Sequence, residues 1–413
     1  MVAPLEGIRV VEVANWMAGP GAAALMADMG AEVVKVEPLR GDAMRQATRQ
    51  PAMPPGVAPL DASFQMDNRG KRGVAVALNR PEGTDLVRRL AARADVFVCN
   101  LMPGRQAKFR LDADTLLALN PRLVHATLTG YGLGGPDATR PGYDLTAFFG
   151  RGAVLHAMAE PDNPAPPRLR PAQGDHTAAL ALLASILAAL RLVETTGKGQ
   201  RLDVSLLSAA AWTMATDLAA TLVDGQNPPQ GGRRARPHAL HGGFRCSDGR
   251  WLLLFMPEPH WWPRFCAAVQ RPEWAEDPRF ASYAGRAQNM AELTVLLDGV
   301  FATRTLEEWG RLFDAEGFIW GPGSTVAEFA ADAQAEVDGL YPTIDHPEAG
   351  TFRTVASPIR ISGADIAPRG PAPSVGQHTT GVLADLGLTA QELTALAADG
   401  IIGGPDLTDQ PAG

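Results

Sequence analysis

The chain opens with a strand, a helix and a second strand in immediate succession, and this order restricts its fold more than any other feature. Residues 8–14 are rich in β-branched side chains and predict a strand. Residues 18–29 are mostly small and apolar, stop at Gly30, and predict a helix. Residues 31–36 predict the next strand. A helix joining two strands makes them parallel, so this opening predicts an α/β fold with a parallel, helix-covered sheet.

The same alternation continues to about residue 130 and then gives way to long helices. Three further strands are predicted at 73–78, 95–99 and 123–129, and one helix at 82–93. Two helical stretches follow, at about 175–197 and 205–224, with a short strand at 200–204 between them.

A Gly-, Pro- and Arg-rich stretch at 225–238 interrupts the chain and predicts a linker. Beyond it, residues 241–246 and 250–256 predict a hairpin that turns on Asp248-Gly249. Aromatic-containing helices are predicted to about 315. Short strands at 340–344 and 351–355 and a helix near 378–386 complete the predicted elements.

Composition restricts the partners and the compartment. The chain has 37 basic and 45 acidic residues, a net charge of −8, and no long run of one sign, which argues against nucleic acid. The apolar stretch at 178–190 is too short to span a bilayer, so no membrane association is expected. Cys99, Cys246 and Cys266 are odd in number and far apart, and the first residues lack the pattern of a signal peptide. We therefore expect a cytoplasmic protein.

Asp175 stands at the start of the most apolar predicted helix, directly after Gly174. A carboxylate has a reference pKa of about 3.9, so at neutral pH it is ionised and can attack an activated acyl group without a helper base. Asp is also a favoured N-cap of helices. From this segment alone both interpretations are open.

Other motifs give weaker signals. Gly130 to Gly135 matches G-x-G-x-x-G, but Pro136 and Pro141 follow where a helix should begin, which disfavours a dinucleotide site. His238 and His241 lack a neighbouring Cys or carboxylate, so no metal site is predicted. No G-x-S-x-G sequence is present, and the apolar strand around Cys99 favours a place in the core.

Two basic segments flank predicted strands. Residues 68–72 (Asn-Arg-Gly-Lys-Arg) precede one strand, and residues 100–108, with Arg105 and Lys108, follow another. We expect both to lie in loops at the ends of the same sheet, where open α/β folds bind ligands and where cations can hold phosphates. Ordinary solvated loops are the alternative.

Taken together, these segments resemble the family III CoA-transferases, a group that includes formyl-CoA and carnitine CoA-transferases. The resemblance runs from residue 4 to about 390 and depends on the order and spacing of several modest motifs. The matching segments are 4–13, 18–20, 27–37, 68–72, 130–132 with 135–136, 142–144, 174–177, 196–200, 376–380 and 383–388.

The resemblance implies a Rossmann-like large α/β domain built from both chain ends, with a smaller α+β domain between them. The large domain would comprise residues 1–225 and 331–413, and the small domain residues 226–330. It also implies that each chain forms a ring and that two rings interlock as a homodimer.

The resemblance further implies an enzyme that moves coenzyme A from an acyl-CoA thioester to a carboxylic acid. Asp175 would be the catalytic aspartate and would form anhydride and aspartyl-CoA thioester intermediates. No metal, and no cofactor beyond coenzyme A as substrate, is expected. Around the substrates we expect the remaining residues of the site: Lys71, Arg72, Arg105 and Lys108 at CoA phosphates, Arg40 at the nucleotide end, Asn100 in the same loop as Arg105, Tyr143 and Asp144 of the Gly-Tyr-Asp motif, and Gly242-Gly243 or Ala18-Gly19 as oxyanion donors.

Two positions depart from patterns within the resembling group. Relatives that racemise 2-methylacyl-CoA carry His where this chain has Tyr143. A phenol with a reference pKa near 10 is a poor base at neutral pH, which favours transfer and leaves racemisation as the alternative. Formyl-CoA transferases carry Gln where this chain has Met17, which indicates a larger, less polar acyl group. A CoA-binding protein without catalysis is a third reading.

Overall fold

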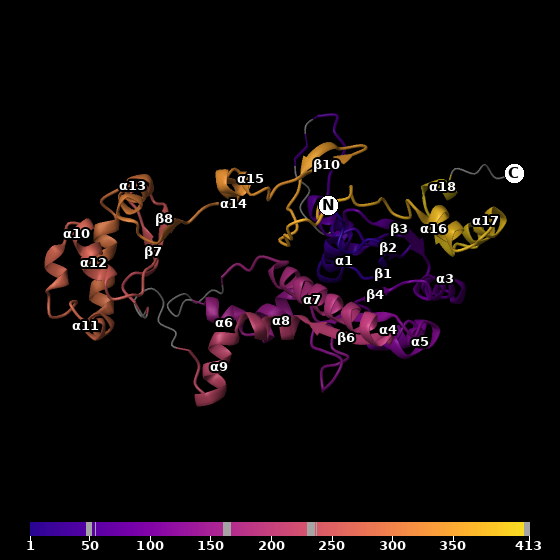
Figure 1. Ribbon diagram of the computed structural model, residues 1–413, viewed down its shortest axis with the longest axis horizontal. Helices are drawn as coiled ribbons and strands as arrows, with labels where there is room; N and C mark the ends of the chain where they lie inside the picture. The colour runs from indigo at the N-terminus through magenta and orange to yellow at the C-terminus, as the bar shows by residue number, and fades with distance from the viewer. Residues whose placement is uncertain (47–51, 54, 160–166, 229–235, 237, 409–413) are drawn as a thin grey trace. The chain divides into compact units, whose positions relative to one another are not determined.

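The computed structural model describes residues 1–46, 52–53, 55–159, 167–228, 236 and 238–408 (Figure 1). The chain forms two compact units, here called unit 1 and unit 2. Unit 1 comprises Met1–His156, Arg168–Ala215 and Glu336–Gly413, so both chain ends belong to it. Unit 2 comprises Ala157–Pro167 and Thr216–Ala335. Unit 2 therefore begins before residue 226, the start of the small domain expected from the sequence.

Unit 1 is built on a seven-stranded sheet in the order β12-β3-β2-β1-β4-β5-β6. Neighbouring strands are parallel except β12, which pairs antiparallel with β3. The predicted parallel sheet is therefore confirmed. The strands are β1 (Arg9–Val13), β2 (Glu32–Glu37), β3 (Arg72–Val76), β4 (Val96–Cys99), β5 (Val124–Thr129), β6 (Gln200–Ser205) and β12 (Ile402–Gly403).

Valine-rich strands are buried on both faces, as expected for a parallel sheet. Val10 packs on one face with α1 (Ala18–Asp28), α7 (Gln173–Thr196) and α8 (Leu206–Thr213). Its neighbour Val11 packs on the other face with α3 (Pro81–Ala91), α5 (Ala113–Leu119) and α16 (Thr379–Asp385). Figure 1 shows α16 and α17 (Ala390–Ala398) beside the β3 edge of the sheet.

The remaining elements of unit 1 are short and connect or flank these layers. They are η1 (Ala43–Gln46), α2 (Ala62–Asn68), α4 (Pro103–Phe109), η2 (Asp144–Arg151), the hairpin β10 (Thr343–His346) and β11 (Gly350–Arg353), and α18 (Pro405–Thr408). Helices α6 (Val154–Met158) and α15 (Ala333–Val337) lie where the chain passes between the units.

One helix prediction differs from the structure. The stretch predicted as one helix at 205–224 is two, α8 and α9 (Ala215–Asp224), bent by 82°. The apolar sequence runs through this bend without Gly or Pro, so nothing local marks it.

Helix α7 has 24 residues, and its length and composition alone would allow it to span a membrane. One face of α7, including Leu182 and Ile186, is buried against the sheet.

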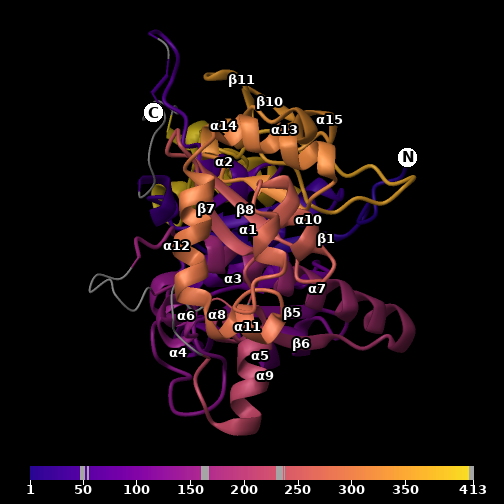
Figure 2. The same ribbon diagram turned by 90° about the vertical axis from the view of Figure 1, so that its left-hand side faces the viewer.

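Unit 2 contains a three-stranded antiparallel sheet and a helical layer. The predicted hairpin is confirmed as β7 (His241–Arg245) and β8 (Trp251–Phe255), and β9 (Trp320–Pro322) pairs with β8. Figure 2 shows α12 (Met290–Phe301) alongside β7. The other elements are α10 (Trp261–Ala268), η4 (Pro272–Ala275), α11 (Tyr283–Gln288), α13 (Leu306–Glu316) and α14 (Val326–Ala330).

Candidate active site

The order of the parallel strands reverses between β1 and β4, which makes their carboxyl ends a switch point where α/β folds bind ligands. Two asparagines join the loops that follow these strands. The backbone N–H of Asn15 donates to Oδ1 of Asn100 at 3.1 Å, and Nδ2 of Asn100 donates to the Asn15 carbonyl at 2.7 Å. This reciprocal pair fixes the spacing between the two diverging loops.

A cavity of about 880 Å³ opens at this switch point, within unit 1. Its volume falls in the range of sites for small molecules and cofactors. It is lined by residues from the loops after β1, β4 and β5 and from α2, η2 and α7. They include Asn15, Trp16, Met17, Ala18, Asp67, Asn100, Arg105, Gly130, Tyr143, Asp144, Asp175 and His176.

Asp175 lies in the first turn of α7 and faces this cavity. The plain N-cap interpretation is wrong, because the N-cap is Ala172, in the left-handed conformation at φ 78°. The side chain of Asp144 takes over the capping. Its Oδ2 accepts the N–H of Ala172 at 2.7 Å and its Oδ1 accepts the N–H of Gly174 at 3.1 Å. The carboxylate of Asp175 is therefore not engaged in closing its own helix.

The cavity raises the pKa of Asp175 to about 7, through burial first and the nearby charge of Asp144 second. His176 acts in the opposite direction and lowers this pKa. Burial also raises the pKa of Asp144, although the N–H groups of Ala172 and Gly174 oppose the rise. Carboxylates with raised pKa values in a cleft are typical of functional sites.

Two ionisable residues of the cavity were missed from the sequence, Asp67 and His176. Nε2 of His176 lies 3.2 Å from Oδ1 of Asp67, and this hydrogen bond raises the pKa of the imidazole. Asp67 is buried, while the histidine is partly exposed to the cavity. The position of His176 beside Asp175 was a usable signal. Asp67 gave none, because only tertiary folding brings α2 to α7.

The structure brings seven of the residues predicted from sequence to one cavity. Trp16, which sequence analysis did not select, joins them as a wall. The seven are Met17, Ala18, Asn100, Arg105, Tyr143, Asp144 and Asp175.

Lys71 and Arg72 are not among the residues that line the cavity, and their contact with CoA phosphates remains a prediction. Lys71 is buried, with Nζ 2.6 Å from Oε2 of Glu12. Arg72 pairs with Glu32 at 2.8 Å and with Asp385 at 2.9 Å. Both cations are held by carboxylates of unit 1, and Nζ of Lys71 also donates to the carbonyls of Pro20 and Asp67, at 2.9 and 2.8 Å.

Four other predicted contacts lie elsewhere. Arg40 and Lys108 are exposed and are not among the residues that line the cavity. Gly242 and Gly243 belong to β7 of unit 2. Their contact with substrate remains a prediction.

A buried ion pair positions Trp16, whose backbone is in the left-handed region at φ 69°. Its N–H donates to Oδ1 of Asp42 at 3.2 Å, and Oδ2 of Asp42 accepts from Nζ of Lys35 at 3.1 Å. The Trp16 ring meets the ring of Tyr143 edge-on, with centroids 5.7 Å apart. These two aromatic side chains form one wall of the cavity.

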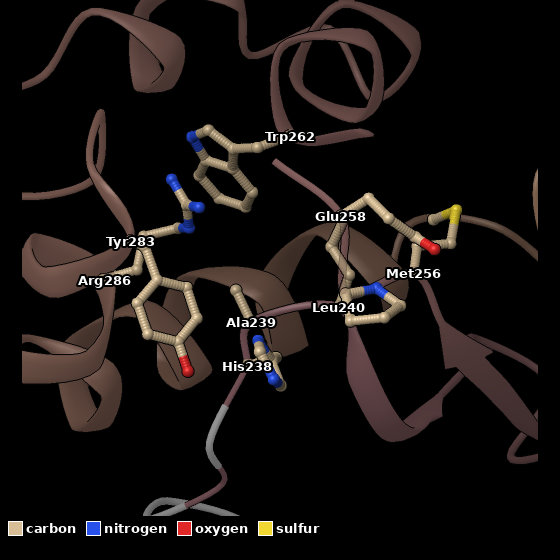
Figure 3. Close-up of a pocket in the computed structure, with 9 residues that line it drawn as sticks. His238, Ala239, Leu240, Met256, Glu258, Trp262, Tyr283 and Arg286 are labelled. Atoms are coloured by element: carbon tan, nitrogen blue, oxygen red, sulfur yellow. The ribbon is translucent and has the colours of Figure 1, made fainter. Parts of the chain in front are cut away.

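Unit 2 contains a much smaller pocket of about 20 Å³ (Figure 3). His238 and Tyr283 lie at one side of it, and Arg286 stacks 4.9 Å over the ring of Trp262. Such a volume holds little more than a water molecule. Among the described residues, no group of three or more His, Cys, Asp or Glu could hold a metal ion. The large cavity of unit 1 is therefore the candidate active site.

Comparison with protein families gives a match to the model described as CoA-transferase family III, over residues 5–379. Among curated proteins, the (R)-2-hydroxy-4-methylpentanoate CoA-transferase of Clostridioides difficile is 30% identical over 94% of this chain and 97% of its own length. The cinnamoyl-CoA:phenyllactate CoA-transferase of Clostridium sporogenes is 29% identical, over 95% of this chain and 96% of its own.

Solved structures give the same assignment. A CAIB/BAIF family protein from Brucella suis superposes with a TM-score of 0.83 at 32% identity. The match covers 94% of this chain and all of that one.

Proposed function

The chain belongs to CoA-transferase family III, and from this premise we propose that Asp175 carries coenzyme A from an acyl-CoA thioester to a carboxylic acid. The observation that supports this role is the placement of Asp175. Its carboxylate faces a cavity of ligand size at the switch point of the sheet, while Asp144 caps the helix in its stead.

The proposed reaction proceeds by four acyl transfers. An oxygen of Asp175 attacks the thioester carbonyl, and the C–S bond breaks to give a mixed anhydride and CoA thiolate. The thiolate attacks the Asp175 carbonyl of this anhydride, which releases the donor acid and leaves an aspartyl-CoA thioester. The acceptor carboxylate then displaces the thiolate, forming a second anhydride. Thiolate attack on the acceptor carbonyl gives the new acyl-CoA and restores Asp175.

Each attack creates an oxyanion that needs hydrogen-bond donors. The amino end of α1 meets the cavity at Ala18, and the first N–H groups of a helix have no partners within it. Among the described residues, no side chain caps α1. The N–H groups of Ala18 and Gly19 are therefore proposed as donors. Gly242 and Gly243 of unit 2 are the alternative.

Arg105 is proposed to bind a CoA phosphate. It follows β4, at the ligand edge of the sheet, and is the cavity-lining residue with a permanent positive charge. The Asn15–Asn100 pair holds the loop that leads from β4 into α4, the helix that carries Arg105.

The proposed acyl group is larger and less polar than formate or oxalate. Trp16, Met17 and Tyr143 form an apolar and aromatic stretch of the cavity wall. Two relatives are named for 2-hydroxy-4-methylpentanoate and phenyllactate, acids with a branched or aromatic chain.

The direct test is to incubate acyl-CoA donors with a panel of carboxylic acids and to measure new thioesters by mass spectrometry. Hydroxylamine added during turnover should convert Asp175 to a hydroxamate in the peptide that contains it. Asp175→Ala should abolish both signals. Asp399→Ala, at an exposed aspartate on the end of α17, is the control and should retain both. Full turnover by Asp175→Ala would refute the mechanism.

Racemisation of 2-methylacyl-CoA is the second candidate, because it would use the same cavity. It requires a base where this chain has Tyr143. Exchange of the α-hydrogen with deuterated water, in the absence of an acceptor acid, would establish it.

We also propose that the protein is a homodimer. Large apolar side chains are exposed on α8 and α9: Trp212 is 82% exposed, Leu222 84% and Val223 89%. Burial of such surface drives association. Sedimentation analysis across a concentration series tests this state.

A further inference from the structure

We propose that His176, held by Asp67, supplies the positive charge that keeps Asp175 ionised before it attacks the thioester. This inference rests on the proposed function of Asp175 and assigns a positioning role to a pair of residues beside it. The pair is formed in the folded structure: Nε2 of His176 lies 3.2 Å from Oδ1 of Asp67, and both residues line the cavity.

The cavity needs such a charge because carboxylates dominate it. Asp67 comes from α2, Asp144 from the start of η2, and Asp175 from α7. The other ionisable groups that line it are Tyr143, Arg105 of α4 and His176 of α7. Arg105 lies in α4, whereas His176 directly follows Asp175 in the first turn of α7. The His176 imidazolium is therefore the cation on the same helix as Asp175.

The surroundings fix the histidine in place. Asp67 is 2% exposed, and its Oδ1 lies against Gly21 of α1, where a Cβ would approach to 3.2 Å. The missing side chain at Gly21 gives the carboxylate the room to face His176. An ionised, buried carboxylate favours the protonated form of a neighbouring imidazole, and the pKa of His176 is raised accordingly.

No proton has to be transferred in this role. When Asp175 attacks, its negative charge passes through the oxyanion to the departing CoA thiolate. The imidazolium keeps its proton and its hydrogen bond to Asp67, and it remains as the counter-charge of a cavity that now contains the thiolate.

The test compares His176→Gln, Asp67→Asn and the double variant with wild type. Glutamine keeps a hydrogen-bonding group at position 176 but carries no charge. For His176→Gln we expect the acidic limb of the pH profile of kcat/KM to move up by about one unit, so that activity falls about tenfold at pH 6 and less than about twofold at pH 9. For Asp67→Asn we expect a smaller shift, because the charge of Asp67 itself raises the pKa of Asp175. The double variant should lose no more than either single variant. His156→Gln, at an exposed histidine of unit 1 outside the cavity, should leave the profile unchanged.

A second measurement does not depend on activity. Histidine labelled with ¹⁵N, assigned through the His176→Gln spectrum, reports the imidazole directly. We expect it to titrate above pH 6.5 in wild type and lower in Asp67→Asn. A neutral imidazole at pH 6.5 in wild type, or an unmoved acidic limb in folded His176→Gln, would overturn the inference. If wild type transfers no CoA, the proposed function fails, and the labelled spectra still decide whether the charged pair exists.

Discussion

Gly174 leaves room for the carboxylate of Asp144: a Cβ at position 174 would overlap with Oδ1 of Asp144 and with the side chain of Phe148. The same oxygen accepts the N–H of Gly174 at 3.1 Å. The glycine before Asp175 is therefore a packing requirement of the cap.

Gly174→Ala should displace Asp144 and shift the first turn of α7. We expect CoA transfer to fall at least about 100-fold, since small misplacements of a reacting group are costly, and unfolding stability to fall by about 2 kcal/mol. Steady-state kinetics and thermal unfolding measure the two effects. Gly299→Ala is the matched control, because Gly299 is an exposed residue within α12 and a Cβ there meets nothing within 4 Å. It should be neutral in activity and slightly stabilising.

Asp175→Asn should be more stable than wild type at pH 8, although inactive. The pKa of Asp175 is raised to about 7 from 3.8. Because the folded state binds this proton more tightly than the unfolded state, the proton stabilises the fold. This contribution is fully present below pH 3.8 and is lost as the pH rises through 7. Asparagine cannot lose that proton, so the variant should gain about 2 kcal/mol at pH 8 and nothing near pH 3.5. Denaturant unfolding at the two pH values tests this. Equal stability of the variant and wild type at pH 8 would contradict the raised pKa of Asp175.

Lys71→Met should change the stability of the protein, whereas Arg105→Gln should change the KM for acyl-CoA. Lys71 is buried, its Nζ pairs with Glu12, and it also donates to the carbonyl of Pro20. Its loss should destabilise the protein by about 3 kcal/mol and leave KM for acyl-CoA unchanged. Arg105→Gln should raise that KM about tenfold, because it removes the proposed phosphate contact, with little change in stability. A higher KM for acyl-CoA in folded Lys71→Met would show that Lys71 contributes to substrate binding.

Thiol alkylation should not inhibit the enzyme. Cys99, Cys246 and Cys266 are buried, and burial raises their pKa values to about 12, 11 and 12. Thiolates are the reactive form, so iodoacetamide at pH 7.5 should modify the unfolded chain but not the native one. Loss of activity that tracks alkylation of one cysteine would contradict this expectation.

Trp16→Ala should change substrate preference. The ring of Trp16 meets that of Tyr143 in the cavity wall. Removing it should lower kcat/KM about tenfold for donors with a branched or aromatic acyl chain, and less for acetyl-CoA, which is too small to contact the wall. Competition between two donors in one reaction measures this ratio without reference to enzyme concentration.

The central sheet was predictable because its strands are buried on both faces and therefore stand out as valine-rich runs. The two-residue strand β12 has no such signal, since two residues show no periodicity. Among the predicted site residues, Met17 and Ala18 after β1 and Asn100 and Arg105 after β4 line the cavity. Lys71 does not line it, because it is buried against Glu12, a partner that local sequence does not reveal. The Asp67–His176 pair was missed for the same reason.

The last strand of the sheet protects an edge. Strand β12 covers the outer side of β3 by pairing Ile402 with Val76. An uncovered strand edge can pair with strands of other molecules. A variant that lacks residues 402–403 would therefore expose the backbone of β3 and aggregate more readily than the intact chain.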